Sequence, residues 1–170
     1  MTDTPLTFTF ADDGTFPNSR LPLLLYKAAV APGEARPEAL ERLFAANGWP
    51  PQWRSGVYPF HHYHSTSHET LGIARGTARL MLGGPEGQQF EVAAGDVIVI
   101  PAGVAHRRLS ASSDFLVVGA YPPGMDWDLL KGQPGDRPKA DENIAAVPRP
   151  ETDPVTGPMG MLPVLWARAG

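Results

Sequence analysis

The stretch GVYPFHHYHSTSHETLGIARG (residues 56–76) contains four of the five histidines of this chain. Its first part, residues 57–64, is typical of an extended strand, in which successive side chains point to opposite faces. His62 and His64 then point to one side, and His61 points to the other. Two imidazoles at this spacing can both reach one metal ion at the usual distance of about 2.0–2.1 Å. The spacing therefore predicts His62 and His64 as metal ligands.

The next candidate ligand lies immediately after these histidines, and local spacing leaves two possibilities open. Residues 65–67 are Ser-Thr-Ser, a composition typical of a turn. Alternation continued through these residues would put His68, and not Glu69, on the face of His62 and His64. A turn interrupts that alternation, so it cannot choose between His68 and Glu69.

The fifth histidine, His106, ends a second informative stretch, GDVIVIPAGVAH (residues 95–106). Around both stretches, short apolar runs alternate with turn residues, which predicts a series of short strands. Connections this short favour antiparallel pairing and an all-β barrel or sandwich. The 18 glycines and 19 prolines of the chain fit such a turn-rich fold. The predicted strands cover residues 57–64, 69–75, 77–82, 89–92, 96–100, 106–110 and 114–121.

The segments on either side of this core region, residues 56–121, differ from it in predicted secondary structure and composition. On the N-terminal side, residues 6–10 and 21–30 are strand candidates. One helix is predicted over residues 36–48, where Leu40, Leu43 and Phe44 fall on one face at spacings of three and four. Pro37 suits the first position of that helix. We expect this helix to cover part of a sheet.

The C-terminal side is rich in proline. Residues 122–163 predict an irregular arm that wraps around the barrel, and the final apolar run MLPVLW (161–166) is a candidate last strand. This segment has too few apolar residues for a core of its own. We therefore expect one domain over residues 1–170.

Composition excludes several classes of protein. The chain has no cysteine, which excludes a disulfide scaffold, a zinc ribbon and a thiol nucleophile. Its net charge is −4 and it has no run of basic residues, so neither a nucleic-acid partner nor a membrane partner is expected. The N-terminal residues lack the pattern of a signal peptide. A cytoplasmic location is the expectation.

Both histidine-containing stretches resemble the cupin superfamily, and in particular small single-domain bacterial cupins of uncharacterised function. The first cupin motif, G-x5-H-x-H-x4-E-x6-G, is matched by Gly56, His62, His64, Glu69 and Gly76. The second, G-x5-P-x-G-x2-H, is matched by Gly95, Pro101, Gly103 and His106. Ser110 departs from the asparagine that usually follows in cupins. The resemblance covers about residues 56–121.

The resemblance implies a cupin jelly-roll barrel or sandwich that holds one divalent transition metal ion, either Fe, Mn, Ni, Co or Zn. Carried over residue by residue, it implies the ligands His62, His64, Glu69 and His106. Three further residues are candidates for catalytic roles. His68 lies beside the ligands, whereas Tyr58 and Arg108 share the inward alternation of His62 and His106. Arg108 is suited to holding a substrate carboxylate or phosphate.

Two classes of function are consistent with these residues. The first is a metal-dependent enzyme that acts on a small molecule, as a dioxygenase or as an isomerase or lyase. The second is a non-catalytic cupin that binds or stores a metal or a small ligand, because a fold does not determine a function. A homodimer is expected in either case, with the strand at residues 6–10 and the C-terminal arm as elements that two copies could exchange.

Overall fold

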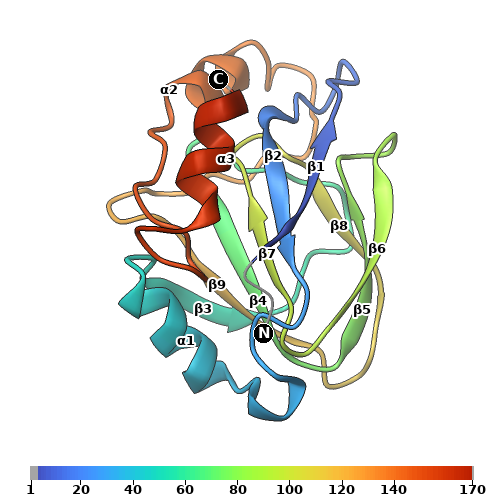
Figure 1. The fold of residues 1–170 in the computed structure, drawn as a ribbon. Helices are drawn as coiled ribbons and strands as arrows, with labels where there is room; N and C mark the ends of the chain where they lie inside the picture. The colour runs from blue at the N-terminus through green and yellow to red at the C-terminus, as the bar shows by residue number, and fades with distance from the viewer. Residues whose placement is uncertain (1–3, 170) are drawn as a thin grey trace.

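The computed structural model describes residues 4–169, so that residues 1–3 and 170 of the predicted single domain lie outside the described part. Two antiparallel sheets dominate the fold, which confirms the predicted all-β sandwich (Figure 1). The six-stranded sheet has the order β1-β2-β7-β4-β9-β3, and the three-stranded sheet has the order β6-β5-β8. The strands are β1 (Leu6–Phe10), β2 (Ser19–Tyr26), β3 (Pro51–Ser55), β4 (Glu69–Arg75), β5 (Thr77–Leu82), β6 (Gln88–Ala93), β7 (Val97–Ile100), β8 (His106–Ala111) and β9 (Leu116–Ala120).

Alternation along the central strands divides the core into two layers. Leu71 and Ile73 of β4 point between the two sheets, where they join an inner cluster with Leu80 and Phe90 of the small sheet. Residues at the other positions of the large sheet point outward into a second cluster. Because β4 and β7 are covered on both faces, all their residues except Arg75 are buried, and β7 is entirely apolar.

Helices cover the outer face of the six-stranded sheet (Figure 1). α1 (Pro37–Ala46) matches the predicted helix and buries Leu40 and Phe44. It approaches β4 so closely that a side chain on Gly72 would lie 2.8 Å from the ring of Phe44. Short helix η1 (Pro32–Glu34) precedes it. No helix within residues 4–169 is both long and apolar enough to cross a membrane.

The C-terminal segment differs from the prediction of an irregular arm with a last strand. It contains two helices, α2 (Lys139–Ala146) and α3 (Met161–Ala169). The run at residues 161–166 is helical because Leu162 and Trp166, four residues apart, both pack on the outer face of the large sheet. A short apolar run does not distinguish a strand from a buried helix by itself, which explains the wrong prediction.

Two further details differ from the predicted strands. Residues 57–64 form no continuous strand and make only single bridges, His62 to His106 and Tyr63 to Leu130. Pro59 lacks the backbone N–H that a ladder needs. Residues 51–55, which lie outside the predicted strands, form strand β3 against β9.

Candidate metal centre

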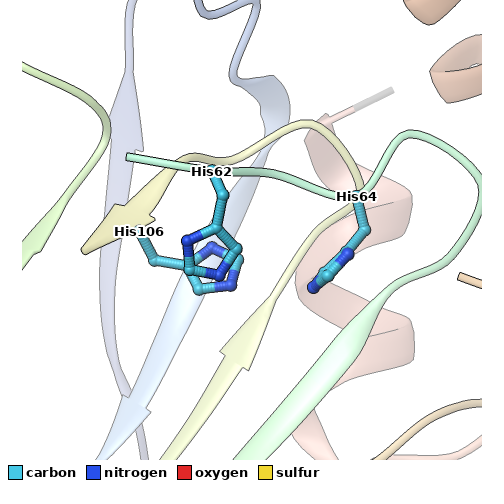
Figure 2. A group of neighbouring side chains, drawn as sticks. All are labelled: His62, His64 and His106. Carbon is cyan, nitrogen blue, oxygen red and sulfur yellow. The ribbon is translucent and has the colours of Figure 1, made fainter. Parts of the chain in front are cut away.

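Three imidazoles converge at one end of the space between the sheets. His62 and His64 come from the loop before β4, and His106 is the first residue of β8; Figure 2 shows their rings pointing toward one another. One ring nitrogen of each lies within 4.8 Å of the others, and all three side chains are buried. The backbones of His62 and His106 exchange two hydrogen bonds, of 3.2 and 2.9 Å, which hold these two residues opposite each other.

Glu69 completes this cluster from the first position of β4. Its Oε2 lies 3.3 Å from Nε2 of His64, and its Oε1 lies 3.1 Å from Nε2 of His106. The side chain is only 3% exposed, and Oε1 has no hydrogen-bond donor among residues 4–169. A buried carboxylate oxygen without a donor is costly unless a cation neutralises it. The carboxylate and the three rings therefore fit a metal ion.

The hydrogen bonds of the rings decide which nitrogen of each histidine is available. Nδ1 of His62 lies 3.0 Å from the carbonyl oxygen of Phe60, and Nδ1 of His106 lies 3.0 Å from that of Val104. Nδ1 of His64 contacts the carbonyl oxygen of Asp128. A carbonyl oxygen only accepts, so each neutral ring carries its proton on Nδ1. The lone pair of every Nε2 is left for a ligand, which is the arrangement that metal-binding histidines use.

The charges within the cluster influence one another. Burial alone would raise the pKa of Glu69, but the neighbouring His64 and His106 outweigh it and hold that pKa well below its usual value. Burial likewise opposes protonation of His64, yet the Glu69 carboxylate raises the pKa of this ring. Burial, with His106 close by, lowers the pKa of His62 to about 3. The carboxylate is thus ionised and His62 is neutral, as a metal ligand must be.

A short chain of hydrogen bonds supports the Glu69 carboxylate. The hydroxyl of Tyr121 donates to Oε2 of Glu69 at 2.6 Å, and Nε1 of Trp53 donates to that hydroxyl at 2.8 Å. The ring of Tyr121 stacks on Trp127 with centroids 4.0 Å apart. Burial and the adjacent carboxylate raise the pKa of Tyr121, so its hydroxyl stays a donor. Sequence reasoning missed Tyr121, although it continues the inward alternation of Val117 in β9.

The segment after β9 fixes the loop that carries His64. Asp128 accepts hydrogen bonds from the backbone N–H and the hydroxyl of Ser65 and from the backbone N–H of Thr66. The hydroxyl of Thr66 in turn donates to the carbonyl oxygen of Asp126. Asp128 was also missed, because no local pattern links it to residues more than 60 positions earlier.

A cavity of about 480 Å³ adjoins the cluster and reaches the surface. The three histidines and Glu69 line it, as do two of the predicted catalytic residues, Tyr58 and Arg108. Tyr58 is 51% exposed and contacts the edge of the His62 ring, so it lies at the opening. The volume of the cavity is in the range of small-molecule sites, about 300–1,000 Å³.

The structure separates His68 from this cavity. β4 alternates from its first residue, so Glu69 points inward with Leu71, and His68 points to the outer face. There the backbone N–H of Ala102 donates to Nδ1 at 2.9 Å, and Nε2 lies 3.1 Å from the carbonyl oxygen of Pro148. Both nitrogens are thus occupied, and burial lowers the pKa of His68 to about 4. The structure thus places His68, which was predicted as a catalytic candidate, outside this cavity, where it links the start of β4 to the C-terminal segment.

Comparison with known sequences gives two similarities. A family model described as a cupin domain matches residues 50–118. The uncharacterized protein YjlB of Bacillus subtilis (strain 168) is 39% identical over 163 residues, which cover 95% of this chain and 96% of that protein.

Solved structures resemble the chain more distantly. A DUF861 family protein from Thermotoga maritima is 19% identical over 57% of this chain and 96% of its own, with a TM-score of 0.36. Acireductone dioxygenase from Bacillus anthracis, with a cadmium ion in its active center, is 16% identical over 58% of this chain and 76% of its own, with a TM-score of 0.37. Likenesses this low carry no argument about function.

Proposed function

This chain belongs to the cupin family, and from that premise we propose that it is a metal-dependent enzyme acting on a small molecule. One divalent first-row transition ion would be held by Nε2 of His62, His64 and His106 and by the carboxylate of Glu69. Nitrogen and oxygen donors of this kind suit such ions, with the choice among them set by geometry and supply. When bound, the ion supplies Lewis-acid chemistry or, if it is redox-active, oxidation by dioxygen.

The observation that carries the metal proposal is the hydrogen-bonding pattern that the three rings share. Each Nδ1 lies against a backbone carbonyl oxygen, one nitrogen of each ring lies within 4.8 Å of the other two, and Nε2 of His64 and of His106 lies beside Glu69. Without a cation between them, the lone pairs of these nitrogens would repel the carboxylate unless a ring took up a proton, as Glu69 favours for His64. The adjoining cavity supports an enzyme over a buried storage site, because it gives a small molecule access to the cluster.

Metal analysis combined with turnover assays tests both parts of the proposal. We expect purified protein, reconstituted separately with Fe(II), Mn(II), Ni(II), Co(II) and Zn(II), to hold about one ion per chain. An oxygen electrode and a panel of small organic acids, sugars and aromatic compounds then test for turnover. Substoichiometric metal in every reconstitution would contradict the site. Full loading without turnover of any compound would favour the alternative, a cupin that only binds.

Tyr121→Phe tests the support of the Glu69 carboxylate. The change removes only the hydroxyl that donates to Oε2 of Glu69. We expect metal affinity to fall about 10- to 100-fold, as for other partners that orient a ligand. Competition with a chelator of known affinity measures the change. Tyr63→Phe is the matched control, because the buried hydroxyl of Tyr63 has no hydrogen-bond partner in the part of the chain that the structure describes, and its removal should leave affinity unchanged. Equal losses in both variants would contradict the role of Tyr121.

His68→Leu separates stability from metal binding. Without the imidazole, the buried N–H of Ala102 and the carbonyl oxygen of Pro148 lose their partner. We expect the free energy of unfolding to fall by about 1–3 kcal/mol, the usual cost of an unsatisfied buried group. Urea denaturation measures it, and metal content should be unchanged. His62→Leu should instead lose metal and keep its free energy of unfolding. Loss of metal from the His68 variant at full stability would make His68 a ligand after all.

A further inference from the structure

Arg108 brings an unpaired positive charge into the cavity beside the metal cluster. It lies two residues after His106 on β8, and the alternation of the strand turns both side chains toward the cavity. Its backbone N–H donates to the carbonyl oxygen of Tyr58 at 2.9 Å, which holds this part of β8 against the cavity rim. Arg108 is half-buried, and within residues 4–169 no carboxylate forms an ion pair with its guanidinium.

Three other arginines of the chain contrast with Arg108 in forming ion pairs. Arg54 pairs with Glu41, Arg79 pairs with Glu91, and Arg137 pairs with two aspartates. Arg107, the neighbour of Arg108 on β8, donates through Nε to the carbonyl oxygen of Pro59. Arg108 therefore keeps its charged donors available at a place that a ligand can enter.

The charge balance of the cavity favours an anionic ligand. Apart from the three histidines, Glu69 and Arg108 are the only ionisable acidic or basic side chains among the described residues that line it. A divalent ion held by the three neutral imidazoles and Glu69 would leave one net positive charge, and Arg108 adds a second. An anion entering this partly desolvated space would gain charge-assisted hydrogen bonds that a neutral ligand lacks.

The walls of the cavity indicate the rest of the ligand. They are mainly aromatic and apolar, being formed by Trp53, Tyr58, Tyr121, Trp127 and the aliphatic Val57 and Leu71. The stacked pair of Tyr121 and Trp127 gives one flat wall. Such walls favour a flat apolar body over a sugar, whose hydroxyls would need hydrogen-bonding partners.

We propose that the ligand is a small carboxylate with a flat apolar body and that Arg108 binds its carboxylate. A single guanidinium matches the two oxygens of one carboxylate, whereas a phosphate dianion would leave further oxygens without donors among the described residues. The assignment rests on the proposed function for the charge of the ion, but the unpaired Arg108 and the aromatic walls do not depend on it. Arg108 is thus a specificity-determining residue.

Calorimetric titration of the metal-loaded protein tests this assignment with simple probes. Benzoate has both the carboxylate and the flat apolar body. Benzamide has a neutral amide in place of the carboxylate, and acetate lacks the apolar body. We expect benzoate to bind at least about tenfold more tightly than either. Arg108→Gln should weaken benzoate binding by roughly 10- to 100-fold, since hydrogen bonds to charged groups are of that strength, and should leave benzamide unchanged. Arg107→Gln is the matched control and should bind benzoate as the wild type does.

Each alternative outcome identifies which part fails. Equal benzoate affinity in the wild type and Arg108→Gln, with circular dichroism showing both folded, would overturn the role of Arg108. Tighter binding of phenyl phosphate than of benzoate would overturn the carboxylate assignment. Measuring metal content in the same samples keeps the two proposals distinguishable. Arg108-dependent benzoate binding to a protein that takes up no metal would support the ligand class and reject the metal enzyme.

Discussion

Replacement of His106 by alanine is expected to abolish stoichiometric metal binding. The His106 ring lies between the other ligands, with its centroid 4.1 Å from that of His62 and its Nε2 3.1 Å from Oε1 of Glu69. Its loss removes one nitrogen ligand and leaves the buried carboxylate less neutralised. The fall in affinity should exceed the roughly 10- to 100-fold loss seen when only an orienting partner is removed. Metal analysis after gel filtration, with a chelator competition for the residual affinity, measures the effect.

His61→Ala provides the matched control for this experiment. His61 belongs to the same histidine-rich stretch, but its ring packs 5.6 Å from that of Phe16, away from the cluster. This variant should keep about one metal ion per chain. A thermal melt of each metal-free variant checks that folding is retained. If His61→Ala lost as much metal as His106→Ala, the assignment of the ligands to one buried cluster would be contradicted.

Trp166→Ala is expected to have the largest effect on stability. Trp166 is fully buried on the outer face of the six-stranded sheet, and its Nε1 donates to the carbonyl oxygen of Pro22 at 2.8 Å. Its ring also packs 4.7 Å from that of His68. Truncation of a buried aromatic side chain costs about 3–5 kcal/mol. The free energy of unfolding should fall by this amount in urea denaturation followed by circular dichroism.

Val164→Ala, in the same helix, is the control for Trp166. Val164 is 45% exposed, and surface changes of this kind alter stability by no more than about 0.5 kcal/mol. A loss below about 1 kcal/mol in Trp166→Ala would mean that α3 does not pack on β2 in solution as the structure places it.

Strand periodicity and the two histidine motifs were sufficient to predict several strands and the candidate metal ligands. The short apolar runs around residues 69–82 correspond to β4 and β5, and the helix around Leu40 and Phe44 is present. The motifs also grouped four residues that the structure brings together: His62, His64, Glu69 and His106. These features depend on neighbours a few residues apart, whose relative directions the backbone geometry determines.

The choice between Glu69 and His68 depends on the residue from which strand alternation is counted. Alternation carried forward from His64 fails at the turn of residues 65–67. Carried backward from the inward-pointing Leu71, the same rule places Glu69 inside and His68 outside. The information was present in the sequence, but it became usable only once the inner face of β4 was known.

The sequence by itself determined the two-sheet core, the first helix and the set of candidate metal ligands. Only the tertiary structure decided the supporting contacts: Tyr121 on Glu69, Asp128 on the loop of His64, and the packing of α3 over β2. The reason is physical. Periodicity reflects the local geometry of the chain, whereas Tyr121 and Asp128 act on residues more than 50 positions away. Such contacts form only when packing brings those segments together, and no local pattern records which segments will meet.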